Sequence, residues 1–171
     1  MSWYLGPAKV PCEHSYNHHG IVVNQKCKLS DRIHEACSKG HKTYFALSDL
    51  GAKFLNPKTL SHFYKKIVLP SVLYGCELWN NMVSSDRAQL NTFQHFICKN
   101  SLNLSKSCRS DMCESLFDTL PIVAEIDVRK LLFFGRLCRL SPKTLTKSIF
   151  LTRLLSYLHD LSDNQLGFIP D

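Results

Sequence analysis

The pattern of apolar and polar positions along the chain predicts a mainly helical fold. From Phe63 to Trp79, apolar side chains recur with the 3.6-residue period of an α-helix, and after Pro70 they continue nearly all the way round. Such a helix passes from a surface into a core, and Pro70 predicts a kink because it lacks a backbone donor. Asn56 and Pro57 form a start signal, so we expect this central helix to run from about residue 57 to Trp79. The positions on its apolar side are Leu60, Phe63, Tyr64, Ile67, Val68, Tyr74, Gly75 and Leu78.

The same period, with local start and stop residues, predicts five further helices. They cover about residues 31–50, 84–98, 111–120, 122–140 and 142–161. Before them, the β-branched run from Tyr16 to Asn24 predicts a strand. We therefore expect a mainly α fold, with about six helices in one helical domain over residues 16–161 and one or two short N-terminal strands. Residues 1–15 are interpreted as an irregular lead-in and residues 162–171 as a tail.

Two features of the last helices predict close packing at that end of the chain. Gly135 lies in the middle of a helix, where it costs about 1 kcal/mol relative to Ala, so we expect another helix to approach closely there. The final helix has a stripe that is most often part of a core, made of Leu151, Leu154, Leu155, Leu158 and Leu161.

Positive charge is concentrated at the front of the chain. The net charge is +7 over 171 residues, and residues 1–66 carry +6 of it. A basic front favours a polyanionic partner such as RNA, DNA or an acidic protein, although a merely solvated face explains the charge equally well. In the rear part, Glu125 is expected to pair with Arg129 at one-turn spacing. The cations that we expect to contact backbone phosphates are Lys28, Arg32, Lys39 and Lys42 on one helix and Lys65 and Lys66 on the next.

Three aromatic residues near these cations could stack on bases. They are Tyr44, Phe45 and Tyr64. Their positions on amphipathic helices favour core packing by roughly four to one.

The segment FYKKIVLPSVLYGCELW also resembles the one that follows the polymerase palm in reverse transcriptases of non-LTR (LINE-type) retrotransposons. The resemblance extends upstream to HHGIVV and KLSDRIHEACSKGHKTYFAL and downstream to RKLLFFGRLCRL, over about residues 16–140. His19 stands where that family usually has Leu. The resemblance implies a C-terminal thumb or connection segment that lies close to the template and product duplex. The parent protein of such a segment would be an RNA-directed DNA polymerase. The palm and fingers of that polymerase, which are missing here, would be the partners of this chain.

A polymerase site is nevertheless absent from the sequence. Two divalent metals require adjacent aspartates, and no Asp-Asp pair occurs, nor does a Gly-rich phosphate loop or a Gly-x-Ser-x-Gly turn. The single aspartates stand apart at Asp49, Asp86, Asp111, Asp127 and Asp160. We therefore expect no enzymatic activity and no cofactor, and instead sequence-independent nucleic-acid binding by a fragment of a reverse transcriptase-like protein. The alternatives are a helical protein-interaction module and a decayed element product without selected activity.

Cysteine and histidine usage gives weak signals for metal or thiol chemistry. Several of the eight cysteines occupy apolar helical positions, where they behave as small buried hydrophobes, and no secretory leader opens the chain, so we expect the cytosol or nucleus. Cys108 and Cys113 flank Arg109, which could lower a thiol pKa, but idle cysteines are several times commoner. We expect no metal site at Cys12, His14, His18 and His19, because their spacing fits neither a paired CxxC nor a His pair one helical turn apart.

The chain also offers no segment for a membrane partner. Its longest apolar run, residues 67–73, is far shorter than the roughly 20 residues that a transmembrane helix requires.

Overall fold

The computed structural model describes residues 3–5, 7–10, 15–18, 20–24, 28–49 and 55–163. Four short strands come first, as two antiparallel pairs: β1 (Trp3–Leu5) with β2 (Ala8–Val10), and β3 (Ser15–His18) with β4 (Ile21–Asn24).

The first strand pair lies inside the segment that was expected to be irregular. The second occupies the run that was expected to be one strand. Gly20 has a φ of +79°, in the left-handed region that glycine enters without a Cβ clash, so the chain reverses there and forms a hairpin.

Helices make up most of the described chain, as predicted. They are α1 (Leu29–Asp49), α2 (Pro57–Phe63), the π-helical turn η2 (Tyr64–Val68), α3 (Leu69–Val72), the 3₁₀ turn η3 (Cys76–Leu78), α4 (Ser84–Ser101), α5 (Ser110–Leu116), α6 (Ile122–Arg139) and α7 (Leu145–Asp163). Because α2, η2 and α3 follow one another without a break, the described residues contain six longer helical segments, and the mainly α fold with about six helices is confirmed.

The central helix starts as predicted but ends seven residues early. Asn56 caps it by accepting a hydrogen bond from the Thr59 backbone N–H at 2.8 Å. Its last residue is Val72 rather than Trp79, because Gly75 adopts a left-handed conformation, with a φ of +72°. The direction of the chain changes there, so Tyr74 and Leu78 are exposed although the helical period placed them on the apolar side.

Pro70 follows a π-helical turn. The backbone N–H of Leu69 bonds to the carbonyl of Tyr64, five residues back. A proline crowds the carbonyl four residues before it, here that of Lys66, and the wider turn of η2 contains that residue. The disturbance expected at Pro70 therefore takes the form of a widened turn just before it.

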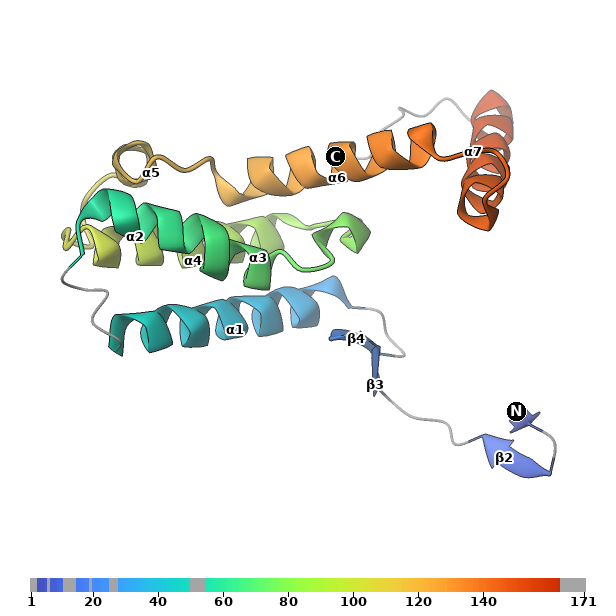
Figure 1. Cartoon of the computed structure of the whole chain (residues 1–171), viewed down its shortest axis with the longest axis horizontal. Helices are drawn as coiled ribbons and strands as arrows, with labels where there is room; N and C mark the ends of the chain where they lie inside the picture. The colour runs from blue at the N-terminus through green and yellow to red at the C-terminus, as the bar shows by residue number, and fades with distance from the viewer. Residues whose placement is uncertain are drawn as a thin grey trace.

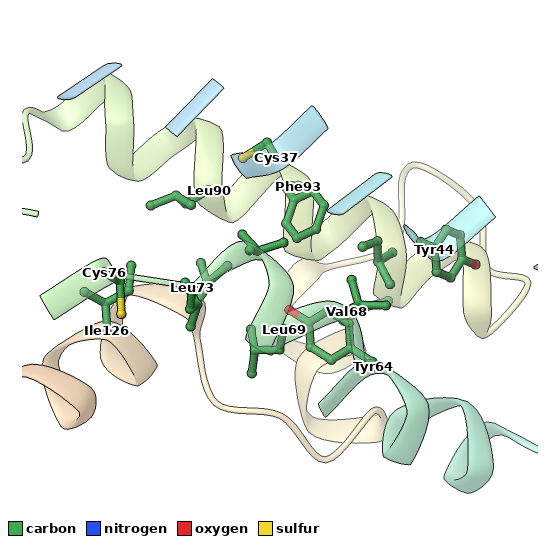
Figure 2. Packing of buried hydrophobic residues seen from close by; sticks show 14 of the residues in the cluster. Cys37, Tyr44, Tyr64, Val68, Leu69, Leu73, Cys76, Leu90, Phe93 and Ile126 are labelled. Atoms are coloured by element: carbon green, nitrogen blue, oxygen red, sulfur yellow. The ribbon is translucent and has the colours of Figure 1, made fainter. Parts of the chain in front are cut away.

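The helices form three layers (Figure 1). α1 lies on one side, the central α2–η2–α3 segment and α4 lie in the middle, and α5 and α6 lie on the other side. Figure 2 shows Tyr64 and Val68 of the central helix, with Leu73 just after it, in one buried cluster with Leu90 and Phe93 of α4. The predicted entry of the central segment into the core is confirmed by the burial of Val72, Leu73, Cys76 and Trp79.

A very close contact joins α1 to the middle layer at Gly40. A methyl group added at this position would lie 2.5 Å from Cζ of Phe93 and closer still to Cγ2 of Val72. Both neighbours are buried, so neither can move away freely. The absence of a side chain at Gly40 is what allows α1 to approach α3 and α4.

A buried glutamine joins α4 to the third layer. The Gln94 side chain accepts a hydrogen bond from the Ile122 backbone N–H at 2.6 Å and donates one to the Leu120 carbonyl at 2.7 Å. These bonds satisfy a backbone donor at the start of α6, where no helical partner exists. They fix the first turn of α6 against α4.

Beyond its first two turns, α6 leaves the core. Ile122 and Ile126 are buried, but Leu131 is 65% exposed, and α7 crosses the end of α6 away from the other helices (Figure 1). The leucine stripe of α7 was expected to belong to the core, and this is wrong for the leucines whose side chains the structure describes. Leu155, for example, is 65% exposed. The close helix contact predicted at Gly135 is wrong, since no atom of another described helix lies within 4 Å of an added Cβ, and the side-chain Nη2 of Arg139, in the same helix, lies 3.8 Å away.

We predict opposite effects for the same substitution at these two glycines. Gly40→Ala forces a methyl group into Val72 and Phe93 and should lower the free energy of unfolding by about 1–3 kcal/mol. Gly135→Ala meets no close neighbour and should raise it by up to about 1 kcal/mol through helix propensity. Denaturant unfolding followed by circular dichroism measures both, and a Gly40→Ala protein as stable as the parent would contradict the packing described here.

Candidate nucleic-acid interface

Four of the six predicted phosphate-binding cations share the outer face of α1. Lys28 directly precedes the helix, and Arg32, Lys39 and Lys42 follow at intervals that return to the same side. The opposite side carries the buried core residues Ile33, Cys37, Gly40, Tyr44 and Ser48. At 1.5 Å of rise per residue, the four cations extend over about 21 Å.

Within the part of the chain that the structure describes, these four cations form no salt bridge. Glu35 lies on the same face, between Arg32 and Lys39, and lowers the local positive potential. The face still has an excess of positive charge on a helix that the core holds in place.

The structure does not bring Lys65 to this face. Its Nζ donates a hydrogen bond at 2.7 Å to Oδ2 of Asp118, two residues after the end of α5, and this contact lowers the pKa of the Asp118 carboxyl. Lys65 therefore points toward the third layer, whereas α1 covers the other side of the middle layer (Figure 1). Lys66 is exposed on η2 and has no ion pair with a described residue.

The three candidate stacking residues divide into two groups. Tyr44 and Tyr64 are core residues, as the helical spacing favoured. The Tyr44 hydroxyl accepts hydrogen bonds from Asn100 and Ser101 at the end of α4. Phe45 is 45% exposed, so the expectation of core packing is wrong for this residue.

Phe45 lies at the edge of a groove between α1 and α4 with a volume of about 800 Å³. Phe96 of α4, 40% exposed, faces it at 6.1 Å between ring centroids, and the buried ring of Phe93 lies beneath. His41 contacts all three phenylalanine rings, with centroid distances of 4.9–6.3 Å. Of its rings, only Phe45 was a candidate from the sequence, because the groove is formed by two helices whose pairing no local pattern reveals.

The imidazole ring of His41 lines this groove and is uncharged at neutral pH. Its Nδ1 atom is buried and has no hydrogen-bond partner among the described residues. Burial lowers the pKa of His41 below its ordinary value, because the charged imidazolium would lose solvation. His41 therefore contributes an aromatic surface, and the charge beside the groove comes from Lys42.

The described residues contain no group of three side chains suited to hold a metal ion. Of the four Cys and His residues considered as metal ligands, Cys12, His14 and His19 lie outside the described residues, as does the side chain of His18.

The lowered thiol pKa considered from the sequence is wrong for Cys113. Arg109 forms a salt bridge with Asp111 at 2.7 Å, and burial raises the pKa of the Cys113 thiol.

A second cationic surface, which we call the α6–α7 arm, comprises residues 128–157. This stretch contains seven Lys or Arg residues and no Asp or Glu, a segregation hidden by the small net charge of the rear part. Its cations alternate with exposed apolar side chains such as Leu131, Leu132 and Ile149. Lys147 is partly used within the arm, because it donates hydrogen bonds to the carbonyls of Leu137 and Cys138.

At the start of the arm, the expected pair of Glu125 and Arg129 is confirmed. Nε of Arg129, the first cation of the stretch, lies 3.2 Å from Oε1 of Glu125.

Comparisons with protein-family models, with curated proteins and with solved structures found no match to this chain. Among the described residues, no helix combines the length and the apolar character needed to cross a membrane.

We predict that the buried thiols are chemically inert in the folded protein. Burial raises the pKa values of Cys37 and Cys76 to about 11 and that of Cys98 to about 12. Their thiolate fraction at pH 8, and with it their alkylation rate, should be at least about a hundredfold below that of an ordinary exposed cysteine. Cys138 is exposed and serves as the internal control.

Timed alkylation followed by peptide mass mapping measures each site. Labelling of Cys37, Cys76 or Cys98 as fast as that of Cys138 would contradict their assignment to the core.

Proposed function

We propose that this protein binds the sugar-phosphate backbone of RNA or DNA without sequence preference, through the outer face of α1. The observation that carries the proposal is the row of four cations on one helix, none of which has an ion pair with a described residue. Phosphate contacts of this kind orient a nucleic acid but carry no sequence information, because they do not touch base edges.

Rigid support strengthens the case for α1. The helix is held by the Gly40 contact with Val72 and Phe93 and by the hydrogen bonds to the Tyr44 hydroxyl. A fixed helix holds its cations in a constant spacing, so phosphate binding does not carry the additional cost of ordering the helix backbone.

The resemblance to non-LTR retrotransposon reverse transcriptases supports the same type of ligand. On this proposal the chain is a non-catalytic C-terminal segment of a reverse transcriptase-like protein and acts in the cytosol or nucleus. A palm and fingers on a parent polymerase would supply the paired carboxylates, which this sequence lacks.

The α6–α7 arm favours a second function, that of a protein-interaction module. Burial of its exposed leucines and phenylalanines against a partner would be favourable, because it removes apolar surface from water. The surrounding cations suit a partner with an apolar surface and an acidic rim. Intermixed apolar residues distinguish this surface from the outer face of α1, where charged and polar side chains predominate.

The salt dependence of binding tests the main proposal. Changing Arg32, Lys39 and Lys42 together to Gln should flatten the plot of log affinity against log salt concentration by roughly two to three units, since each lost phosphate contact removes about 0.7–0.9. Fluorescence anisotropy with several labelled oligonucleotides of unrelated sequence measures the slope, and the relative affinities for these sequences should not change.

A matched triple change of Arg129, Arg136 and Arg139 to Gln serves as the control. It removes the same charge from the arm and should flatten the slope by no more than about one unit, because the proposed phosphate contacts lie on α1 and Arg129 is already paired with Glu125. Equal flattening by both triples would mean that the binding surface is not confined to α1. No flattening by either would reject nucleic-acid binding and favour the protein-interaction module.

A further inference from the structure

The groove between α1 and α4 has the composition of a stacking site. Its exposed edges are the rings of Phe45 and Phe96, with Phe93 and His41 behind them, and the described lining residues include no Leu, Ile or Val. Bases of single-stranded nucleic acid stack on exposed aromatic rings beside a positively charged surface. The lining therefore favours a flat, aromatic ligand.

The groove also lies beside the outer face of α1. Lys42 belongs to both surfaces, and Lys39 is one helical turn before it. No acidic residue is among the described residues that line the groove. An extended chain of phosphates along α1 would thus run beside a row of rings, with nothing in the groove to repel it.

We infer that the groove binds unpaired bases of single-stranded nucleic acid, which stack on Phe45 and Phe96 while Lys39 and Lys42 hold the adjoining phosphates. This inference rests on the proposed function and goes further, because it names single strands as the preferred ligand. In a duplex the bases are paired and stacked inside the helix, so only the phosphates can reach α1. Neutral His41 supports the site by packing against both exposed rings.

The geometry of the two exposed rings fits this role. Their planes meet at 61°, so a base that lies flat on one ring presents its edge to the other. Phe45 is also held from the side by the Tyr44 ring, at 5.7 Å between centroids, and the Tyr44 hydroxyl is bonded to α4. The rings are therefore positioned before any ligand binds.

A comparison of oligonucleotides with and without bases tests the inference. The probes are oligo(dA) of about 12 nucleotides, within the range of common single-strand sites, an abasic oligomer of equal length and a duplex of equal length. The full chain should bind oligo(dA) at least about fivefold more tightly than the abasic oligomer, which has the same phosphates but nothing to stack.

The double variant Phe45→Leu with Phe96→Leu removes the rings but keeps apolar side chains at both exposed positions. Its affinity for oligo(dA) should fall by about fivefold or more, while its affinities for the abasic oligomer and the duplex stay within about twofold of the parent. The control is Phe133→Leu with Phe134→Leu on α6, two partly exposed phenylalanines outside the groove, which should leave all three affinities unchanged. Melting curves of both variants establish that they fold.

The outcomes separate this inference from the proposed function. Equal binding of oligo(dA) and the abasic oligomer, or an unchanged affinity of the groove variant for oligo(dA), overturns base stacking but leaves backbone binding intact. A loss caused only by the α6 variant moves stacking to the arm and also overturns the inference. Failure of all three probes to bind rejects the proposed function itself and leaves the groove to an aromatic or apolar group of a protein partner.

Discussion

The structure depends on the absence of a side chain at Gly40. Because no Cβ is present there, Val72 and Phe93 can reach the backbone of α1, and the first layer lies directly on the second. This contact determines which side of α1 faces outward, and the outward side carries the four cations. The same approach brings Phe93 and Phe96 of α4 beside His41 and Phe45 of α1, so the basic face and the aromatic groove have a common structural cause.

Local pattern was sufficient to predict the helices but not the packing between them. The start signal at Asn56 and Pro57 and the burial of Val72, Leu73 and Trp79 could be predicted because they depend on short-range preferences and on one strong apolar period. The early end at Val72 could not, because one left-handed glycine overrode a period that continued beyond it. Gly40 and Gly135 illustrate the limit, since both are mid-helix glycines and only the tertiary structure distinguishes a helix crossing from an open surface.

The candidate site was predictable to the same degree. Spacing along one helix correctly grouped Lys28, Arg32, Lys39 and Lys42, because helical geometry alone places them on one side. Lys65 was separated from them by an ion pair with Asp118, a residue 53 positions away that no local pattern could connect to it. The net charge of the rear part does not reveal the α6–α7 arm, because acids outside residues 128–157 offset its seven cations in the sum.

The central claim is that the outer face of α1, rather than the α6–α7 arm, meets nucleic acid. Titration of ¹⁵N-labelled protein with a single-stranded oligonucleotide, read residue by residue from the backbone amide signals, locates the contact surface directly. The account predicts that the largest changes in backbone amide chemical shift occur on α1 between Arg32 and Phe45, with smaller changes on α4 near Phe96. Shifts confined to residues 128–157, with α1 unchanged, would contradict it.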